Sequence, residues 1–187
     1  MERNDDLIEL INLCKQNNSI AQQKIFNCYK NKLFALCLRY SRSSSEAEDM
    51  LMEGWVRIFK KINGFEPTED FRPCSFEVWM KKIMINNAIN IYRANKKHNK
   101  LEIHVEEKIE KNEEMFETDY TFSEEELIEC VQKLPKSLRL IFNMSAIDLY
   151  NNKELSEELN MTPDSVKSNL YKARKFLKEE LKKIASK

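Results

Sequence analysis

Glycine is almost absent from this chain, which has two glycines and four prolines among 187 residues. Two-residue β-hairpin turns need residues that accept positive φ, and glycine most often fills that role. The segments between these few breakers are long runs of residues with good helix propensity. The sequence therefore predicts an all-α fold.

Changes in composition divide the predicted helices into two domains. Residues 5–100 contain a series of amphipathic segments, and residues 123–187 contain a second series. Residues 101–122 between them are acidic and lack a sustained apolar stripe, which is typical of a linker. Ser123 and Glu126 have the spacing of a capping box and mark the start of the second domain. We therefore expect two small helical domains joined by an acidic linker, with no internal repeat.

The net charge of the chain is zero, yet its charges are unevenly distributed. Residues 80–100 hold six Lys or Arg and no Asp or Glu, and residues 133–187 have a net charge of +5. Residues 101–132 between them have a net charge of −10. Two basic segments therefore flank an acidic one, and local fields of this kind favour contact with nucleic acid.

Several classes of protein are excluded by motifs that the sequence lacks. We find no glycine-rich phosphate loop, no cluster at metal-ligand spacing and no nucleophile with a spaced base. His98 and His104 are six residues apart, which does not place them on one helical face, so they do not predict a zinc site. We therefore expect no enzyme activity, no cofactor, no metal and no small-molecule substrate.

The cellular location is indicated by cysteine usage and hydropathy. The five cysteines are odd in number and no two have C-x-x-C spacing, so a reducing cytosol fits better than a disulfide framework. The chain has no run of about 18 apolar residues, and its acidic start differs from a signal peptide. We expect a cytoplasmic protein that does not insert directly into a membrane.

The stretch ELSEELNMTPDSVKSNLYKARKFL, residues 154–177, has the pattern of two helices joined by a short turn. Asn160 suits the turn because Asn tolerates the left-handed conformation. Thr162 is a favourable N-cap, and Pro163 fits the first helical position. A helix, a turn and a capped helix make up the helix-turn-helix plan. The second helix has a predicted buried stripe of Val166, Leu170, Ala173 and Leu177.

The opposite face of that second helix carries Lys and short polar side chains. A helix of this kind can enter the major groove of DNA, with its cations on phosphates and its polar groups on base edges. For this stretch alone, an ordinary helical hairpin with a solvated basic face is the alternative. We interpret the tail KFLKEELKKIASK as a solvated amphipathic end.

Two separate stretches of the chain point to one family. EAEDMLMEGWVRIFKKINGF and SFEVWMKKIMINNAINIYRANKK resemble the second conserved region of bacterial RNA polymerase sigma factors. LPKSLRLIFNMSAIDLYNNKELSEELNMTPDSVKSNLYKARKFL resembles the fourth conserved region. With these two regions and a short linker, the chain is similar to the extracytoplasmic-function (ECF) group of the sigma-70 family.

This resemblance implies a protein that binds core RNA polymerase, directs it to promoter DNA and helps to open that DNA. The polymerase carries the chemistry, and the resemblance implies no active site in the sigma factor itself. It also implies regulation by an anti-sigma factor, which is membrane-anchored for many members of the group. The alternative is a stand-alone helix-turn-helix transcriptional regulator, which would leave the first domain unexplained.

A predicted helix over Glu46–Ile62 is assigned by the resemblance to the clamp helices of the polymerase. Its outward face mixes apolar and charged groups, which suits a helix-on-helix interface, although a solvated charged face has the same pattern. The family usually has Gln at the position of Met52, and a flexible Met can also pack at an interface. The expected polymerase-binding residues are Asp49, Met52, Glu53 and Val56.

The next helix, from about Phe76, and the loop before it resemble the part of the family that recognises and melts the minus-ten element. Phe76 and Trp79 are expected in the core, since aromatic residues at helical spacing usually pack inward. A second stripe of cations and amides suits a sugar-phosphate backbone and unpaired bases, and the loop resembles one that captures a flipped base. The family often has Asp where this chain has Asn90. The expected single-strand-binding residues are Phe71, Arg72, Ser75, Lys82, Asn86, Asn90, Arg93 and Lys97.

The helix-turn-helix is assigned by the resemblance to the minus-thirty-five element. The family often has Arg at Asn169 and Gly at Asn160, and the first difference predicts a changed promoter preference. Asn at a base edge favours adenine. The expected duplex-binding residues are Lys167, Ser168, Asn169, Tyr171, Lys172 and Arg174.

Overall fold

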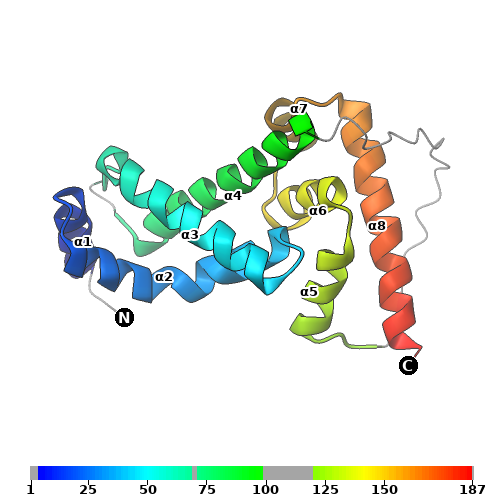
Figure 1. Ribbon diagram of the computed structural model, residues 1–187, viewed down its shortest axis with the longest axis horizontal. Coiled ribbons are helices and arrows are strands. Elements are labelled where there is room, and N and C mark those ends of the chain that lie inside the picture. The colour runs from blue at the N-terminus through cyan, green and yellow to red at the C-terminus, as the bar shows by residue number, and fades with distance from the viewer. Residues whose placement is uncertain (1–3, 69–70, 99–119, 187) are drawn as a thin grey trace. The chain divides into compact units, whose positions relative to one another are not determined.

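The computed structural model describes residues 4–68, 71–98 and 120–186. These residues form helices joined by turns, and no strand occurs among them (Figure 1). The predicted all-α fold is confirmed. The chain divides into two compact units, Met1–Ala88 and Ile89–Lys187, and the division falls inside a long helix. The domain limits expected from the sequence stay predictions, because residues 101–119 of the expected linker lie outside the described residues.

Four α-helices follow one another in the N-terminal part of the chain (Figure 1). Ser43 accepts a hydrogen bond from the Glu46 backbone N–H at 3.3 Å, and this cap starts the third helix two residues before the expected Glu46. Such caps satisfy N–H groups that the first turn leaves without partners. The helices are α1 (Asn4–Lys15), α2 (Ser19–Tyr40), α3 (Ser44–Lys61) and α4 (Pro73–His98), with a 3-10 turn, η1 (Ile62–Gly64), after α3.

Aromatic rings fill the core around the start of α4. Phe76 is fully buried, and its ring lies 5.6 Å from that of Trp79, 5.0 Å from Phe65 and 5.8 Å from Tyr29. Trp79 is half-buried at the edge of this cluster. The expectation of a core position is confirmed for Phe76, whereas Trp79 packs on the core from its edge. Rings at these separations add to the stability gained from burial.

The α3 and α4 helices approach closely at Gly54. A Cβ atom at this position would lie 2.0 Å from the sulfur of Met84 and 2.6 Å from its terminal methyl carbon. Met84 is fully buried, so its side chain has little free space into which to move. The absence of a side chain at Gly54 therefore sets the separation of the two helices at this point.

The C-terminal part of the chain begins with the predicted capping box. The Ser123 backbone N–H donates to a Glu126 carboxylate oxygen at 2.8 Å, and the Glu126 N–H donates to the Ser123 hydroxyl at 3.2 Å. This reciprocal pair confirms the expected helix start. The elements that follow are α5 (Glu124–Lys133), α6 (Lys136–Phe142), a π-helical turn η2 (Asn143–Ile147), α7 (Asn152–Leu159) and α8 (Pro163–Ala185).

A buried arginine joins α5 to α6. Arg139 is fully buried, and its guanidinium donates to the carbonyl oxygens of Gln132 at 2.8 Å and Leu134 at 3.1 Å. These carbonyls lie at the end of α5, where the helix has no further N–H groups to offer them. Asn143, also fully buried, donates to the Arg139 carbonyl at 2.9 Å. The sequence did not predict either burial, because both residue types are usually exposed.

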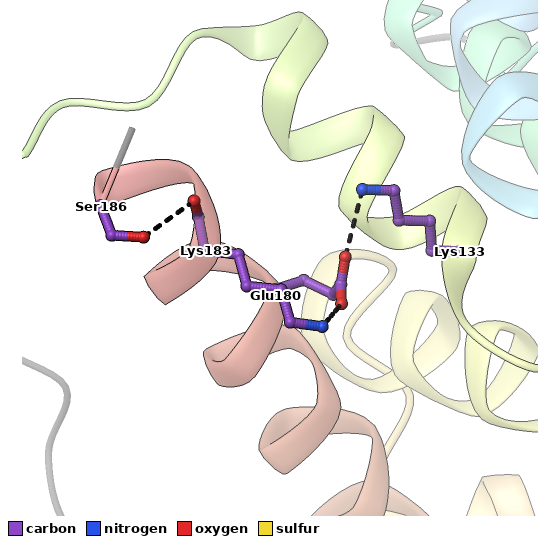
Figure 2. Close-up of polar contacts among 4 residues, drawn as sticks. All are labelled: Lys133, Glu180, Lys183 and Ser186. Carbon is purple, nitrogen blue, oxygen red and sulfur yellow. Dashed lines mark hydrogen bonds and ion pairs between the residues drawn. The ribbon is translucent and has the colours of Figure 1, made fainter.

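The second half of α8 packs against α5. Cys130 and Leu134 form a buried cluster with Ala173 and Leu177, and half-buried hydrophobic residues further along α8 pack on that cluster. Glu180 of α8 accepts hydrogen bonds from Lys133 of α5 and from Lys183, one turn on (Figure 2). The prediction of a solvated tail was therefore wrong: Phe176, Leu181 and Ile184 complete the core of this unit.

We expect Gly54→Ala to destabilise the protein by about 1 kcal/mol or more. Overpacking costs about 1–3 kcal/mol, and the 2.0 Å approach to Met84 places this change in the upper part of that range, above the gain of about 0.5–1 kcal/mol in helix propensity. Shortening the neighbour in Met84→Val should make Gly54→Ala neutral or favourable. Chemical denaturation of the four proteins in this double-mutant cycle measures the coupling.

Gly64→Ala is the matched control, because a Cβ at Gly64 would meet nothing within 4 Å. This control should leave stability unchanged or slightly raised. If Gly54→Ala lowered the free energy of unfolding equally with and without Met84→Val, the close contact between Gly54 and Met84 would be contradicted.

We expect Glu180→Gln to flatten the acid dependence of stability. Hydrogen bonds from Lys183 and then Lys133 hold the pKa of the Glu180 carboxyl below its ordinary value. A carboxyl whose pKa is lowered by folding stabilises the protein above the unfolded pKa of about 4.3, and this contribution is lost as the pH falls through the folded pKa. In thermal unfolding at a series of pH values, the Tm of Glu180→Gln should lie slightly below that of the wild type at pH 7, and this difference should disappear in acid.

Glu179→Gln changes the same charge at the exposed neighbouring position and serves as the control. The pH dependence of its Tm should be closer to that of the wild type than the pH dependence of Glu180→Gln is. A deficit for Glu180→Gln that stays constant down to pH 2 would show that packing, and not charge, is responsible.

Candidate nucleic-acid interface

The helix-turn-helix expected from the sequence is present in the structure. Asn160 ends α7 with φ 50° and ψ 56°, the left-handed conformation predicted for the turn. The Thr162 hydroxyl accepts a hydrogen bond from the Ser165 N–H at 3.2 Å, and Pro163 is the first residue of α8. Leu155 and Leu159 of α7 are buried, as are all four residues of the predicted α8 stripe. The turn, the cap and the buried faces are therefore confirmed.

Burial of that stripe orients the remaining faces of α8. Lys167 and Arg174 are exposed, and the other expected duplex-binding residues are half-buried. The amide nitrogen of Asn169 donates to the Ser165 carbonyl at 2.8 Å, so its oxygen is the atom turned away from the helix backbone. The structure thus brings all six residues onto the first three turns of one helix: Lys167, Ser168, Asn169, Tyr171, Lys172 and Arg174.

Electrostatics distinguish α8 from the segment before it. The pKa of Tyr150 is raised by burial and then by the nearby carboxylates of Glu158, Asp148 and Glu154. Three carboxylates therefore lie near Tyr150 at the start of the helix-turn-helix, whereas the middle of α8 carries Lys and Arg. An anionic backbone is attracted to the α8 side of this motif.

The α4 helix presents a basic face without acidic residues beyond Glu77. Lys82 and Asn90 are exposed, and Asn86 is half-buried. Arg93 is also exposed, and its guanidinium forms an ion pair with Glu158 at 3.5 Å. Lys97 lies in the last turns of α4, where side-chain positions are outside the described part of the chain. The stripe predicted from the sequence also included Ile89, which is buried at 1% exposure, so the accessible part of the stripe is interrupted there. Its described polar members lie along one continuous helix.

Of the three residues predicted to bind single-stranded DNA around the start of α4, one is buried in the core and two are exposed. Phe71 is only 6% exposed, and its ring lies 6.2 Å from that of Phe65. Arg72 and Ser75 are exposed, and the Ser75 N–H donates to the Arg72 carbonyl at 2.8 Å in the first turn of the helix. Phe71 therefore anchors the loop, while its two polar partners are accessible.

The outward face of α3 combines two carboxylates with two large apolar side chains. Met52 is 57% exposed and Val56 is 53% exposed, although both lie on a well-packed helix. Asp49 and Glu53 are exposed beside them. All four residues predicted to bind the polymerase therefore share one accessible face.

One exposed apolar residue was not anticipated from the sequence. Leu149 is 81% exposed and has φ 61°, in the turn between η2 and α7. Leucine rarely adopts this conformation, because its Cβ crowds the backbone there. The sequence did not indicate a positive φ at Leu149, because Gly and Asn are the residues that usually mark such a turn.

The described residues form neither a membrane-spanning helix nor a cluster of metal-ligand side chains. None of the described helices is both long and apolar enough to cross a membrane. Within residues 4–68, 71–98 and 120–186, no group of three His, Cys, Asp or Glu residues is placed to hold a metal ion.

Two family matches cover the segments that carry these faces. Residues 25–98 match Sigma-70 region 2, and residues 124–177 match Sigma-70, region 4. The chain belongs to the sigma-70 family of bacterial RNA polymerase sigma factors. Sigma factors bind core RNA polymerase, recognise promoter DNA and help to open it, and this chain is such a factor. The first match gives the stand-alone regulator no support, because it places a sigma region before the helix-turn-helix.

Curated relatives identify the group within the family. The chain is 26% identical over 181 residues to ECF RNA polymerase sigma factor SigW of Bacillus subtilis, covering 91% of this chain and 94% of that protein. It is 23% identical over 155 residues to ECF RNA polymerase sigma factor SigM of the same species, covering 83% and 91%. This sigma factor is therefore a member of the ECF group.

A solved structure supports the fold. The sigma factor RpoE, crystallised in complex with the anti-sigma factor NepR from Bartonella quintana, superposes with a TM-score of 0.50 at 16% identity. The superposition covers 86% of this chain and 96% of that one. At this level of identity the likeness shows the shared fold alone.

Proposed function

We propose that this sigma factor binds core RNA polymerase through the outward face of α3. The observation that carries the proposal is the exposure of Met52 and Val56, 57% and 53%, between the carboxylates of Asp49 and Glu53. Exposed apolar side chains on a rigid helix gain free energy when a partner covers them. The flanking carboxylates give the interface a preferred orientation against a basic partner.

We propose that α4 and the loop before it bind the minus-ten element. Exposed cations on α4 suit the phosphates of the separated strands, and its amides suit unpaired bases. In this proposal Arg72 and Ser75, which are both exposed, contact a flipped base, and the packing of Phe71 against Phe65 supports the position of their loop. The residues in this proposal are Phe71, Arg72, Ser75, Lys82, Asn86, Asn90, Arg93 and Lys97.

We propose that α8 reads the minus-thirty-five element in the major groove. Lys167, Lys172 and Arg174 bind phosphates, and Ser168 and Asn169 reach base edges, with Tyr171 packing on sugar or on a thymine methyl group. The placement of these cations and short polar groups on the outer side of one helix supports the proposal.

We further propose that the protein acts in the cytoplasm, where core polymerase and the chromosome are found, and that it has no catalytic activity or cofactor of its own. An anti-sigma factor is the expected regulator, and it is membrane-anchored for many members of the ECF group. The sigma factor RpoE from Bartonella quintana was crystallised with an anti-sigma factor, NepR. That complex supports the proposal of an anti-sigma partner for this chain.

Transcription in vitro tests the proposed polymerase face. The protein is added to cognate core polymerase on fragmented host DNA, and the transcript starts are mapped. We expect discrete starts that share two upstream motifs and that are absent with core alone. Val56→Glu should remove these starts, because it places a third carboxylate on the interface and removes its apolar contact.

Val78→Glu makes the same substitution at an apolar residue of α4 that is 63% exposed, and it serves as the control for added charge. Core binding should be lost in Val56→Glu and kept in Val78→Glu. Equal core binding by wild type and Val56→Glu would contradict the assignment of α3.

The roles on α8 predict two different losses of duplex binding. Asn169→Ala should reduce discrimination at one base pair by about 1–3 kcal/mol, since a base-edge contact carries sequence information. Lys167→Ala should weaken binding to all sequences alike and lower the salt slope by about 1, because it removes one phosphate contact. Titrations of wild-type and single-base-changed duplexes at several salt concentrations measure both effects. A uniform loss with Asn169→Ala would assign that residue to the phosphates.

A further inference from the structure

The α4 helix buries an amide at its contact with α3. Asn87 is fully buried, and its amide nitrogen donates to the backbone carbonyl oxygen of Met50 at 3.3 Å. Its side-chain oxygen accepts no hydrogen bond from any residue in the described part of the chain. Met80, Ile83 and Met84 are buried on the same helix, so the amide lies in largely apolar surroundings.

Stability alone does not explain this residue. A buried polar atom without a partner costs about 1–3 kcal/mol, and a single neutral hydrogen bond returns about 1 kcal/mol. A leucine of similar size would carry no such cost in an apolar core. Asn87 therefore contributes something other than net stability.

The apolar contact near Asn87 sets the separation of α3 and α4 but contains no hydrogen bond that would fix the position of α4 along α3. Gly54 presents bare backbone, and Met84, which faces it, is the most adaptable of the large apolar side chains. Met50 is one turn before Gly54, and Asn87 is nearly one turn after Met84. The hydrogen bond between Asn87 and Met50 is a directional contact, whereas the neighbouring contact between Gly54 and Met84 is apolar and has no preferred direction. A single buried Asn fixes the register of paired helices in coiled coils in the same way.

We propose that Asn87 is a positioning residue that fixes the register of α4 on α3. The proposal rests on the proposed roles of the two helices, because it links the polymerase-binding face of α3 to the DNA-binding face of α4. A slip of one helical turn would move the side chains of α4 by about 5.4 Å. Lys82 and Asn86 would then be misplaced relative to a polymerase bound at Met52 and Val56.

Asn87→Leu tests this role in the full-length protein. Nitroxide labels at Glu48→Cys on α3 and Val78→Cys on α4, both exposed positions, report the distance between the two helices. The exposed Cys28 and Cys74 are first replaced by Ser. The buried cysteines stay unlabelled, because burial raises the pKa of Cys14 to about 11, of Cys37 to about 12, and also that of Cys130.

We expect a single narrow distance distribution with Asn87 and a broadened or double distribution with Asn87→Leu, at an unchanged or raised Tm. Affinity for core polymerase should be retained, while open-complex formation, measured by permanganate reactivity of unpaired thymines, should fall about tenfold. Ile83→Leu conserves volume one turn earlier on the same buried side, and it should behave as the wild type.

A narrow distribution together with normal opening in Asn87→Leu would overturn the proposal. A lowered Tm with equal losses of core binding and opening would also overturn it, because it would show a purely stabilising role. The distance measurement needs neither polymerase nor DNA. If Asn87→Leu changed the distance but the wild type supported no transcription, the proposed roles of α3 and α4 would be contradicted. The assignment of Asn87 to the register of the two helices would still stand.

Discussion

Every regular element in the described part of this chain is a helix, and a helix satisfies most of its backbone hydrogen bonds internally. Strands in a sheet are aligned by their backbones, whereas helices are aligned by their side chains alone. The positions of the helices therefore depend on a few side-chain contacts. Gly54 against Met84 sets one separation, and Arg139 at the end of α5 sets one junction.

Each functional face in this sigma factor is the outer side of a helix whose inner side is core. Val166 and Leu170 are buried, so the residues between them lie on the side of α8 that we propose faces DNA. Phe76 and Met80 are buried in the same way on α4. A substitution in the core can therefore change recognition without touching DNA, because it rotates or shifts the face that does.

Hydrogen bonds at the ends of the helices determine where much of the local structure begins and ends. Ser43, Ser123, Asn151 and Thr162 each accept hydrogen bonds from the first turn of a helix, and Asn160 supplies the left-handed residue between α7 and α8. These contacts are local in sequence, so they do not depend on which distant residues pack against the helix. They fix where each helix starts, and therefore which residues of α8 fall on its outer side.

The sequence by itself determined the helical class, the caps, the turn at Asn160 and the buried stripes, because all of these depend on residues within one or two turns of each other. Two motifs in order were also enough to predict the sigma-factor family. Only the tertiary structure decided that the end of α8 belongs to the core, that Arg139 and Asn143 are buried, that Phe71 faces inward, and that Gly54 receives Met84. These features depend on residues brought together from different helices, and the periodicity of a single helix does not say which neighbour covers its face.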